Sequence, residues 1–227
     1  MGVAPSLRAL LFDFDGLVLD TESTEFRTWS ELYERHGHGL ELERWADAIG
    51  TLNGFDPATH LASLGVTLGE EDLEARERRN LDLCDLEELR PGVVELLEAA
   101  ERRGIATAIV SSSSDDWIAR HLDVRGLRER FRTIVCANHD PSRAKPRPTL
   151  YLEALERLDV RADEAMAFED SPYGVAAATA AGIFCVAVPN DVTARLDLSR
   201  ADVVVDSLAG LTIDALERLR HPEPVEG

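Results

Sequence analysis

The chain has 227 residues, of which 44% are hydrophobic and 30% charged, so it can form one large globular domain or two smaller ones. Its formal net charge of −19 argues against nucleic-acid binding, which needs a basic surface. Three scattered cysteines, with no signal peptide and no apolar run of transmembrane length, predict a cytoplasmic protein that does not contact membranes.

The first predicted strand, residues 9–12, is short and apolar, and it runs directly into Asp13-Phe14-Asp15-Gly16. Two carboxylates one residue apart are costly to bury unless a cation or fixed dipoles neutralise them. Gly16 allows a sharp turn just after them. A plain turn would also explain this tetrapeptide, because Asp and Gly are common turn residues. In an open α/β sheet, however, ligands bind at the carboxyl ends of the strands.

Residues 21–89 form a polar, Glu- and Arg-rich segment with helical spacing, as at Phe26, Trp29, Leu32 and Tyr33. Glycine-containing turn signals divide it into several helices. We expect a helical insertion between the first strand and the rest of the fold, in which these aromatic residues form a core.

From Arg90 onward, helices and strands are expected to alternate, as in a parallel sheet with right-handed crossovers. Proline and glycine punctuate the predicted helices at their starts and ends. The pattern predicts helices over 91–103, 115–122, 148–158, 172–181 and 208–219, and strands over 105–110, 133–137, 165–168, 183–188 and 203–205.

Three further polar features follow predicted strands or precede helices. They are the run Ser111–Ser114, the loop that holds Lys145, and the pair Glu169-Asp170. Lys145 is the single lysine of the chain, and lysine commonly binds phosphate as a compact point charge. Each feature alone could be a helix cap or a chance occurrence. Together with Asp13, they should lie at one edge of one sheet.

The combination predicts carboxylates for a hard cation beside hydroxyl, backbone N–H and lysine groups for an oxyanion. Carboxyl oxygens with room for water suit Mg²⁺, which shares its site with substrate phosphate. The lack of a His/Cys cluster argues against zinc. An aspartate can also act as a nucleophile and form an aspartyl phosphate.

The ordered set of Asp13-x-Asp15-Gly16, Ser111, Lys145 and Glu169-Asp170 resembles the haloacid dehalogenase superfamily, and the similarity runs from about residue 7 to 205. The residues around these motifs are most similar to its β-phosphoglucomutase-like and sugar-phosphatase branch. The resemblance implies an α/β fold: a Rossmann-like parallel sheet core, residues 1–16 and 90–227, with an inserted helical cap, residues 17–89.

The resemblance also implies roles for individual residues. Asp13 would be the nucleophile and Asp15 the general acid/base. Mg²⁺ would be held by the Asp13 carboxylate, the Asp15 carbonyl and Asp170, with Glu169 close by or ligating. Ser111, Ser112 and Lys145 would bind the phosphoryl oxygens.

We therefore expect a phosphoric monoester hydrolase that acts on a small phosphorylated metabolite, most simply a sugar phosphate, as a monomer or weak homodimer. Asp15 argues against carbon–halogen cleavage, and a cap without lysine argues against phosphonoacetaldehyde hydrolysis. Asn53, Arg76 and Arg79 are the expected specificity residues in the cap.

Two other functions stay open. The first is a β-phosphoglucomutase-type mutase, although Glu25 and Asn53 stand where that family has His and Arg. The second is a non-catalytic phosphorylation switch similar to a receiver domain, although receiver domains lack an insertion of this size.

Overall fold

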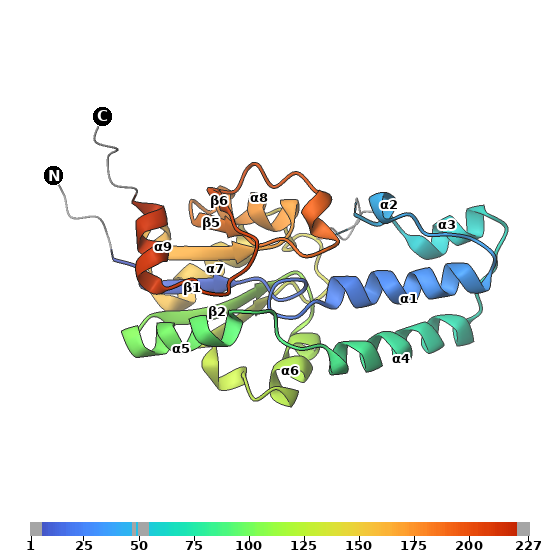
Figure 1. The fold of residues 1–227 in the computed structure, drawn as a ribbon, viewed down its shortest axis with the longest axis horizontal. Helices are drawn as coiled ribbons and strands as arrows, with labels where there is room; N and C mark the ends of the chain where they lie inside the picture. Colours follow the sequence, from blue (N-terminus) through green and yellow to red (C-terminus); the bar gives the residue numbers. More distant parts are fainter. Residues whose placement is uncertain (1–5, 47–48, 50–54, 222–227) are drawn as a thin grey trace.

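A computed structural model of the chain describes residues 6–46, 49 and 55–221. Its centre is a parallel sheet with the strand order β3-β2-β1-β4-β5-β6 (Figure 1). The strands are β1 (Ala9–Phe12), β2 (Ala106–Ser111), β3 (Thr133–Cys136), β4 (Ala165–Glu169), β5 (Phe184–Ala187) and β6 (Val203–Val204).

The central strand β1 is buried on both faces, which explains why its four residues are all apolar. Its last residue, Phe12, lies opposite Ile109 of β2 and Phe168 of β4. The rings of Phe12 and Phe168 stack with their centroids 5.0 Å apart. This register places the residues that follow β1 and β4 side by side at the carboxyl edge of the sheet.

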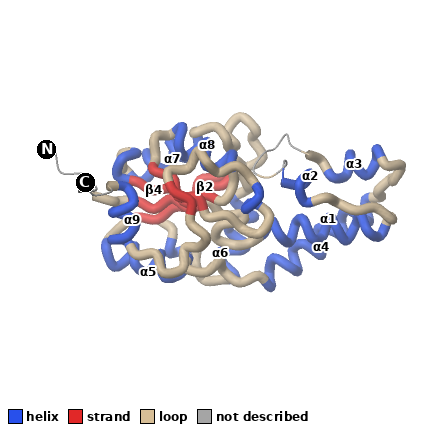
Figure 2. Tube along the Cα trace, turned by 45° about the horizontal axis from the view of Figure 1, so that its top comes forward, coloured by secondary structure: helices blue, strands red, loops and turns tan. Residues whose placement is uncertain are grey.

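Helices cover both faces of the sheet (Figure 2). One hydrophobic cluster joins a face of the sheet to α5, α6 and α9, and a second joins the other face to α7 and α8. These helices are α5 (Val93–Arg103), α6 (Asp115–Val124), α7 (Thr149–Leu158), α8 (Pro172–Ala180) and α9 (Ile213–Arg220), with short 3₁₀ turns at Arg128–Arg130, Ala162–Glu164 and Thr193–Arg195. The expected α/β class, with a Rossmann-like parallel core, is confirmed.

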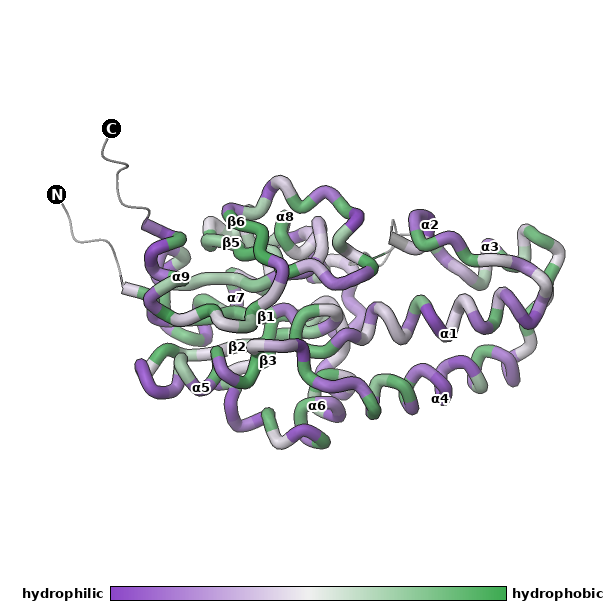
Figure 3. Tube along the Cα trace, in the orientation of Figure 1, coloured by the Kyte–Doolittle hydropathy of each residue, from purple (hydrophilic) through white to green (hydrophobic). Residues whose placement is uncertain are grey.

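A helical segment extends from the carboxyl edge of the sheet, with its long helices α1 and α4 packed side by side (Figure 1). It comprises α1 (Thr21–Arg35), α2 (Leu42–Ala46), α3 (Pro57–Ser63) and α4 (Glu70–Leu86). Its buried residues include Trp29, Leu32 and Tyr33, as expected for a core of its own. Hydrophilic and hydrophobic residues alternate along α1 and α4, as in amphipathic helices (Figure 3).

The two connections between this segment and the sheet lie against each other. Leu19 pairs with Leu89, and the Arg90 amide donates to the Val18 carbonyl at 3.0 Å. The chain therefore leaves and re-enters the sheet region at one place. The domain division at residues 16 and 90 stays a prediction.

Most predicted elements begin and end within two residues of the observed ones, but the last helix differs. It was expected from Leu208 and begins at Ile213, because Gly210 has a φ of +77° and the Thr212 side chain caps the helix. Within the described residues, no helix is both long and apolar enough to cross a membrane.

Candidate active site

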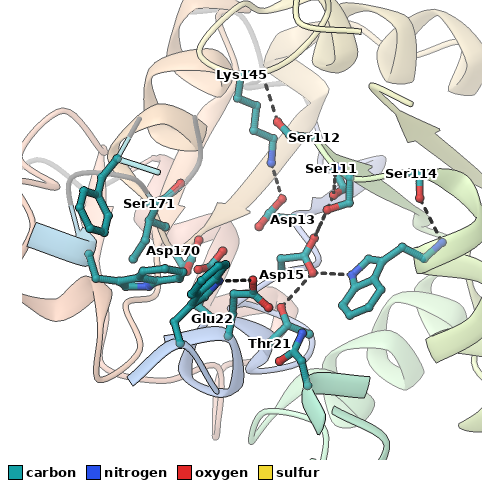
Figure 4. Close-up of a pocket in the computed structure, with 18 of the residues that line it drawn as sticks. Asp13, Asp15, Thr21, Glu22, Ser111, Ser112, Ser114, Lys145, Asp170 and Ser171 are labelled. Carbon is teal, nitrogen blue, oxygen red and sulfur yellow. Dashed lines mark hydrogen bonds and ion pairs between the residues drawn. The ribbon is translucent and has the colours of Figure 1, made fainter. Parts of the chain in front are cut away.

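The polar segments predicted at strand ends meet at the carboxyl edge of the sheet (Figure 4). Asp13 directly follows β1, and Ser111 ends β2. Glu169 is the last residue of β4, one residue later than the strand end expected from the sequence, and Asp170 follows it. Lys145 reaches the same place from the loop before α7.

The ammonium group of Lys145 is buried between two carboxylates. Its Nζ contacts Asp13 Oδ1 and lies 2.6 Å from Glu169 Oε1, while its backbone N–H donates to Ser112 Oγ at 3.2 Å. Burial alone would lower the pKa of Lys145, but these two carboxylates raise it above its usual range. The two carboxylates therefore stabilise the charged form of Lys145 beside Asp13.

The acidic groups of the site are poorly compensated. Burial raises the pKa of Asp13 to about 8; Lys145 opposes this rise, whereas Glu169 and Asp15 add to it. Burial and the charge of Asp13 likewise raise the pKa of Asp170 well above its ordinary value. One buried ammonium thus faces more carboxyl groups than it can neutralise, and a bound cation would favour their charged forms.

The acidic cluster fits a divalent metal ion. Asp13, Glu169 and Asp170 are all buried, and each offers a carboxylate oxygen within 4.8 Å of the others. Among the described residues, the buried Glu169 Oε2 has no hydrogen-bond partner, although Oε1 accepts from Tyr151 and Lys145. An all-oxygen set of this kind suits Mg²⁺. The side chain of Asp15 lies outside this cluster.

Two glycines allow the backbone to approach the acidic cluster closely. Gly16 has a φ of +79°, and a Cβ there would lie 2.2 Å from Asp170 Oδ2. Gly174, in the first turn of α8, would place a Cβ 1.8 Å from Glu169 Oε2. A side chain at either position would displace a carboxylate, so the glycines form part of the site.

The side chain of Asp15 lies on the side of Asp13 away from Lys145 (Figure 4). It accepts hydrogen bonds from Thr21, Ser113 and Trp117 at 2.6–2.9 Å, and from Ser111 at 3.3 Å. The predicted pair Asp13 and Asp15 therefore separates into two environments, one ionic and one made of neutral donors.

Asp13 and Asp15 line a cavity of about 750 Å³ between the sheet edge and the helical segment. Lys145, Asp170 and the serines 111–114 line it on the sheet side. The helical segment contributes aromatic and acidic side chains: Glu22, Glu25, Trp29, Trp45, Phe55 and Glu77. Burial, with the neighbouring Asp15 and Glu25, raises the pKa of Glu22 to about 8.

The two arginines predicted as specificity residues lie outside the lining of this cavity. Arg76 is buried and forms ion pairs with Glu25 at 2.8 Å and Glu77 at 2.5 Å, and its guanidinium lies 4.7 Å from the centre of the Trp29 ring. Arg79 pairs with Glu31 at 3.5 Å, and both arginines line a separate groove between α1 and α4. Asn53 falls outside the described residues.

Several residues of the site were not found from the sequence. Asn190 donates to Asp170 Oδ2 at 2.9 Å, and Arg90 donates to the Gly16 carbonyl at 2.7 Å. Asn190 follows β5, so its position after a predicted strand could have identified it as a candidate site residue. Tyr151 and Trp117 lie within helices, where spacing alone does not distinguish a site residue from a core residue.

Comparison with known proteins gives consistent matches. A sequence profile of haloacid dehalogenase-like hydrolases matches residues 10–188. YhcW of Bacillus subtilis is 41% identical over 212 residues, covering 92% of this chain and 96% of YhcW. The fructose-1-phosphate phosphatase YqaB of Escherichia coli is 33% identical over 188 residues, covering 79% of this chain and 95% of YqaB.

A solved structure agrees with these sequence matches. CbbY from Rhodobacter sphaeroides, in complex with phosphate, superposes with a TM-score of 0.74 at 29% identity, covering 93% of this chain and 99% of CbbY. The enzyme class expected from the motifs, a phosphoric monoester hydrolase, is confirmed at the level of the family. The chain belongs to the haloacid dehalogenase-like hydrolases.

Proposed function

We propose that the protein is a Mg²⁺-dependent phosphatase that hydrolyses a small sugar phosphate through an aspartyl phosphate. The observation that supports this most strongly is the position of Asp13. It lies at the end of the central strand, beside the buried Lys145 ammonium and the Glu169-Asp170 carboxylates, and it faces the cavity. A nucleophile, a cation for phosphoryl oxygens and metal ligands thus meet at one point.

In the first half of the reaction, an Asp13 oxygen attacks phosphorus and the bond to the leaving oxygen breaks. Asp15 gives its proton to that oxygen, and Lys145, Ser111 and Ser112 bind the phosphoryl oxygens. In the second half, Asp15 takes a proton from water as the water attacks phosphorus. The Asp13–phosphorus bond then breaks and releases inorganic phosphate.

Asp13, the Asp15 carbonyl and Asp170 would hold Mg²⁺, with Glu169 close by or ligating. The ion would supply positive charge that offsets the repulsion between these carboxylates and a phosphate dianion. Asn190 and Arg90 support the site by fixing Asp170 and the turn at Gly16.

The helical wall of the cavity favours hydrolysis over the mutase alternative. A mutase must bind a bisphosphate at both ends, which requires a cation remote from Asp13. Among the described residues that line the cavity, Lys145 is the only lysine or arginine, and it lies beside Asp13. The arginine nearest to the wall, Arg76, is neutralised by Glu25 and Glu77.

The same wall limits the substrate. Aromatic rings such as Trp29 and Phe55 can pack on the apolar face of a sugar, and carboxylates such as Glu22 can accept hydrogen bonds from hydroxyl groups. A second anionic group on the substrate would face carboxyl groups, and no described lysine or arginine on this wall would neutralise it. We therefore expect monophosphates whose remaining part is neutral or cationic.

Phosphate release from a panel of phosphorylated metabolites tests the function, and a charge series tests the substrate class. Glucosamine 6-phosphate, glucose 6-phosphate and 6-phosphogluconate have similar skeletons and carry a cationic, a neutral and an anionic group. We expect kcat/KM to be lowest for 6-phosphogluconate. A preference for it, or for fructose 1,6-bisphosphate, would contradict the proposed substrate class.

The mutase alternative has its own test. Given β-glucose 1-phosphate, with or without a bisphosphate primer, the protein should release glucose and phosphate. Primer-dependent formation of glucose 6-phosphate faster than hydrolysis would establish the mutase instead.

A further inference from the structure

Trp117 makes a direct contact with the group that the mechanism uses to move protons. Its indole Nε1 donates to Asp15 Oδ1 at 2.8 Å, and Thr21 Oγ1 donates to the same oxygen at 2.9 Å. The other carboxylate oxygen, Oδ2, accepts from Ser113 Oγ at 2.6 Å and Ser111 Oγ at 3.3 Å.

The indole is itself anchored in the sheet domain. Trp117 lies in the first turn of α6, and its backbone N–H donates to the capping Ser114 Oγ at 3.3 Å. Its ring packs edge-on against His121, with centroids 4.3 Å apart, and His121 stacks on Phe14. Phe14 lies between Asp13 and Asp15 in the chain, so the anchor is continuous with the catalytic strand end.

The chemistry of the donors distinguishes the two oxygens of Asp15. An indole N–H can only donate a hydrogen bond, whereas a serine or threonine hydroxyl can either donate or accept. Oδ1 therefore has to remain an acceptor while Trp117 is in contact with it. Oδ2, whose partners among the described residues are serine hydroxyls, can carry a proton, because those hydroxyls can turn to accept.

We propose that Trp117 is a positioning residue for Asp15: it fixes the rotation of the carboxyl group and makes Oδ2 the oxygen that gives and takes the proton. The proposal rests on the proposed function, in which Asp15 is the general acid. A tryptophan that only lined the cavity or packed on the substrate would not control the orientation of Asp15.

Trp117→Phe keeps the aromatic packing and removes the N–H. The test compares kcat/KM for an alkyl phosphate, whose leaving oxygen needs a proton, with that for p-nitrophenyl phosphate, whose leaving group does not. Because kcat/KM covers only the steps up to phosphoryl transfer, the comparison isolates general-acid help. We expect a loss of about 10- to 100-fold on the alkyl ester, part of the usual contribution of a general acid, and little loss on the aryl ester.

Two variants complete the kinetic test. Trp45→Phe is the matched control, because Trp45 lines the same cavity, whereas the indole that donates to Asp15 is that of Trp117. This control should leave the ratio of kcat/KM for the alkyl and aryl esters unchanged. Asp15→Asn should lower that ratio more than Trp117→Phe, and the double variant should lose no more than Asp15→Asn. Equal losses on both esters, or additive losses in the double variant, would overturn the proposal.

A spectroscopic test does not depend on activity. The chain has three tryptophans, so a ¹⁵N-labelled sample should show three indole N–H signals. The signal that disappears in Trp117→Phe should shift in Asp15→Asn, and the other two should not. An unmoved Trp117 signal would disprove the hydrogen bond, whereas a shifted signal in a protein inactive on all phosphate esters would count against the proposed function alone.

Discussion

Replacement of Gly174 by alanine sets two effects of known size against each other. In a helix interior, alanine is more favourable than glycine by about 1 kcal/mol, so helix propensity alone predicts a more stable protein. The new Cβ, however, would lie 1.8 Å from Glu169 Oε2 and 2.1 Å from its Cδ. Moving the carboxylate to an ordinary contact distance of 3.4 Å requires a shift of about 1.6 Å, the difference between these distances.

Glu169 cannot move that far and keep its partners. Its Oε1 accepts from Tyr151 and lies 2.6 Å from Lys145 Nζ. Each hydrogen bond to a charged group contributes about 1.5–3 kcal/mol, so the displacement outweighs the gain in propensity. Because both partners would be lost, we expect Gly174→Ala to lower the free energy of unfolding by about 2–5 kcal/mol after the gain in propensity, and to weaken Mg²⁺-dependent activity.

Urea unfolding followed by circular dichroism measures the effect. Ala176→Gly, in the same helix, is the matched control and should cost about 1 kcal/mol from propensity alone. In a Glu169→Ala background the obstructing carboxylate is absent, so Gly174→Ala should become stabilising. A Gly174→Ala protein that is more stable and fully active in the native background would refute this account of the site.

Three further predictions concern the charged groups. Asp13→Asn should abolish measurable turnover, whereas Asp15→Asn should retain substrate binding and lose about 10²–10⁴-fold in kcat; steady-state kinetics with the best substrate distinguish the two. Lys145→Arg should lower kcat/KM about 10²-fold and leave the circular dichroism spectrum unchanged. The reason is that a planar guanidinium cannot occupy the buried position between Asp13 and Glu169. Kinetics equal to those of the native protein would show that any cation suffices. In EDTA, the free energy of unfolding should fall as the pH rises from about 4 to 8, because the folded pKa values of Asp13 and Glu22, about 8, exceed their ordinary values of 3.8 and 4.5. The fall should be up to ~1.4 kcal/mol per pH unit for each extra proton bound by the native state. Mg²⁺ should flatten this slope, and a metal-free stability that rises with pH in urea titrations would contradict the prediction.

The sequence predicted the sheet and the meeting of its polar strand ends well, and the reason is geometric. Parallel strands present their carboxyl ends at one edge, so Asp13, Ser111 and Glu169 had to converge once the alternation was recognised. The start of α9 was wrong because the apolar residues from Leu208 suggested a helix turn. The helix begins later because Gly210 has a left-handed backbone conformation and the Thr212 side chain caps the first turn.

The partners of individual side chains could not be predicted in the same way. Arg76 was expected to face the substrate, but in the fold it lies between Glu25 and Glu77. Trp117 and Tyr151 lie in amphipathic helices, where spacing does not distinguish a site residue from a core residue, and only the packing of α6 and α7 brings them to Asp15 and Glu169. Such contacts depend on helix rotation and on pairing across the fold, which residue spacing does not encode.

Chemical trapping of the phosphoenzyme tests the central claim most directly. The Asp15→Asn variant, which should slow hydrolysis of the intermediate, is mixed with Mg²⁺ and p-nitrophenyl phosphate, whose leaving group needs no proton from Asp15. The mixture is quenched in acid and treated with borohydride, which reduces an aspartyl phosphate to homoserine. Peptide mass spectrometry should then find homoserine at position 13 and an unmodified aspartate there when substrate is omitted. Release of phosphate with an unmodified Asp13 throughout a single turnover would contradict the mechanism.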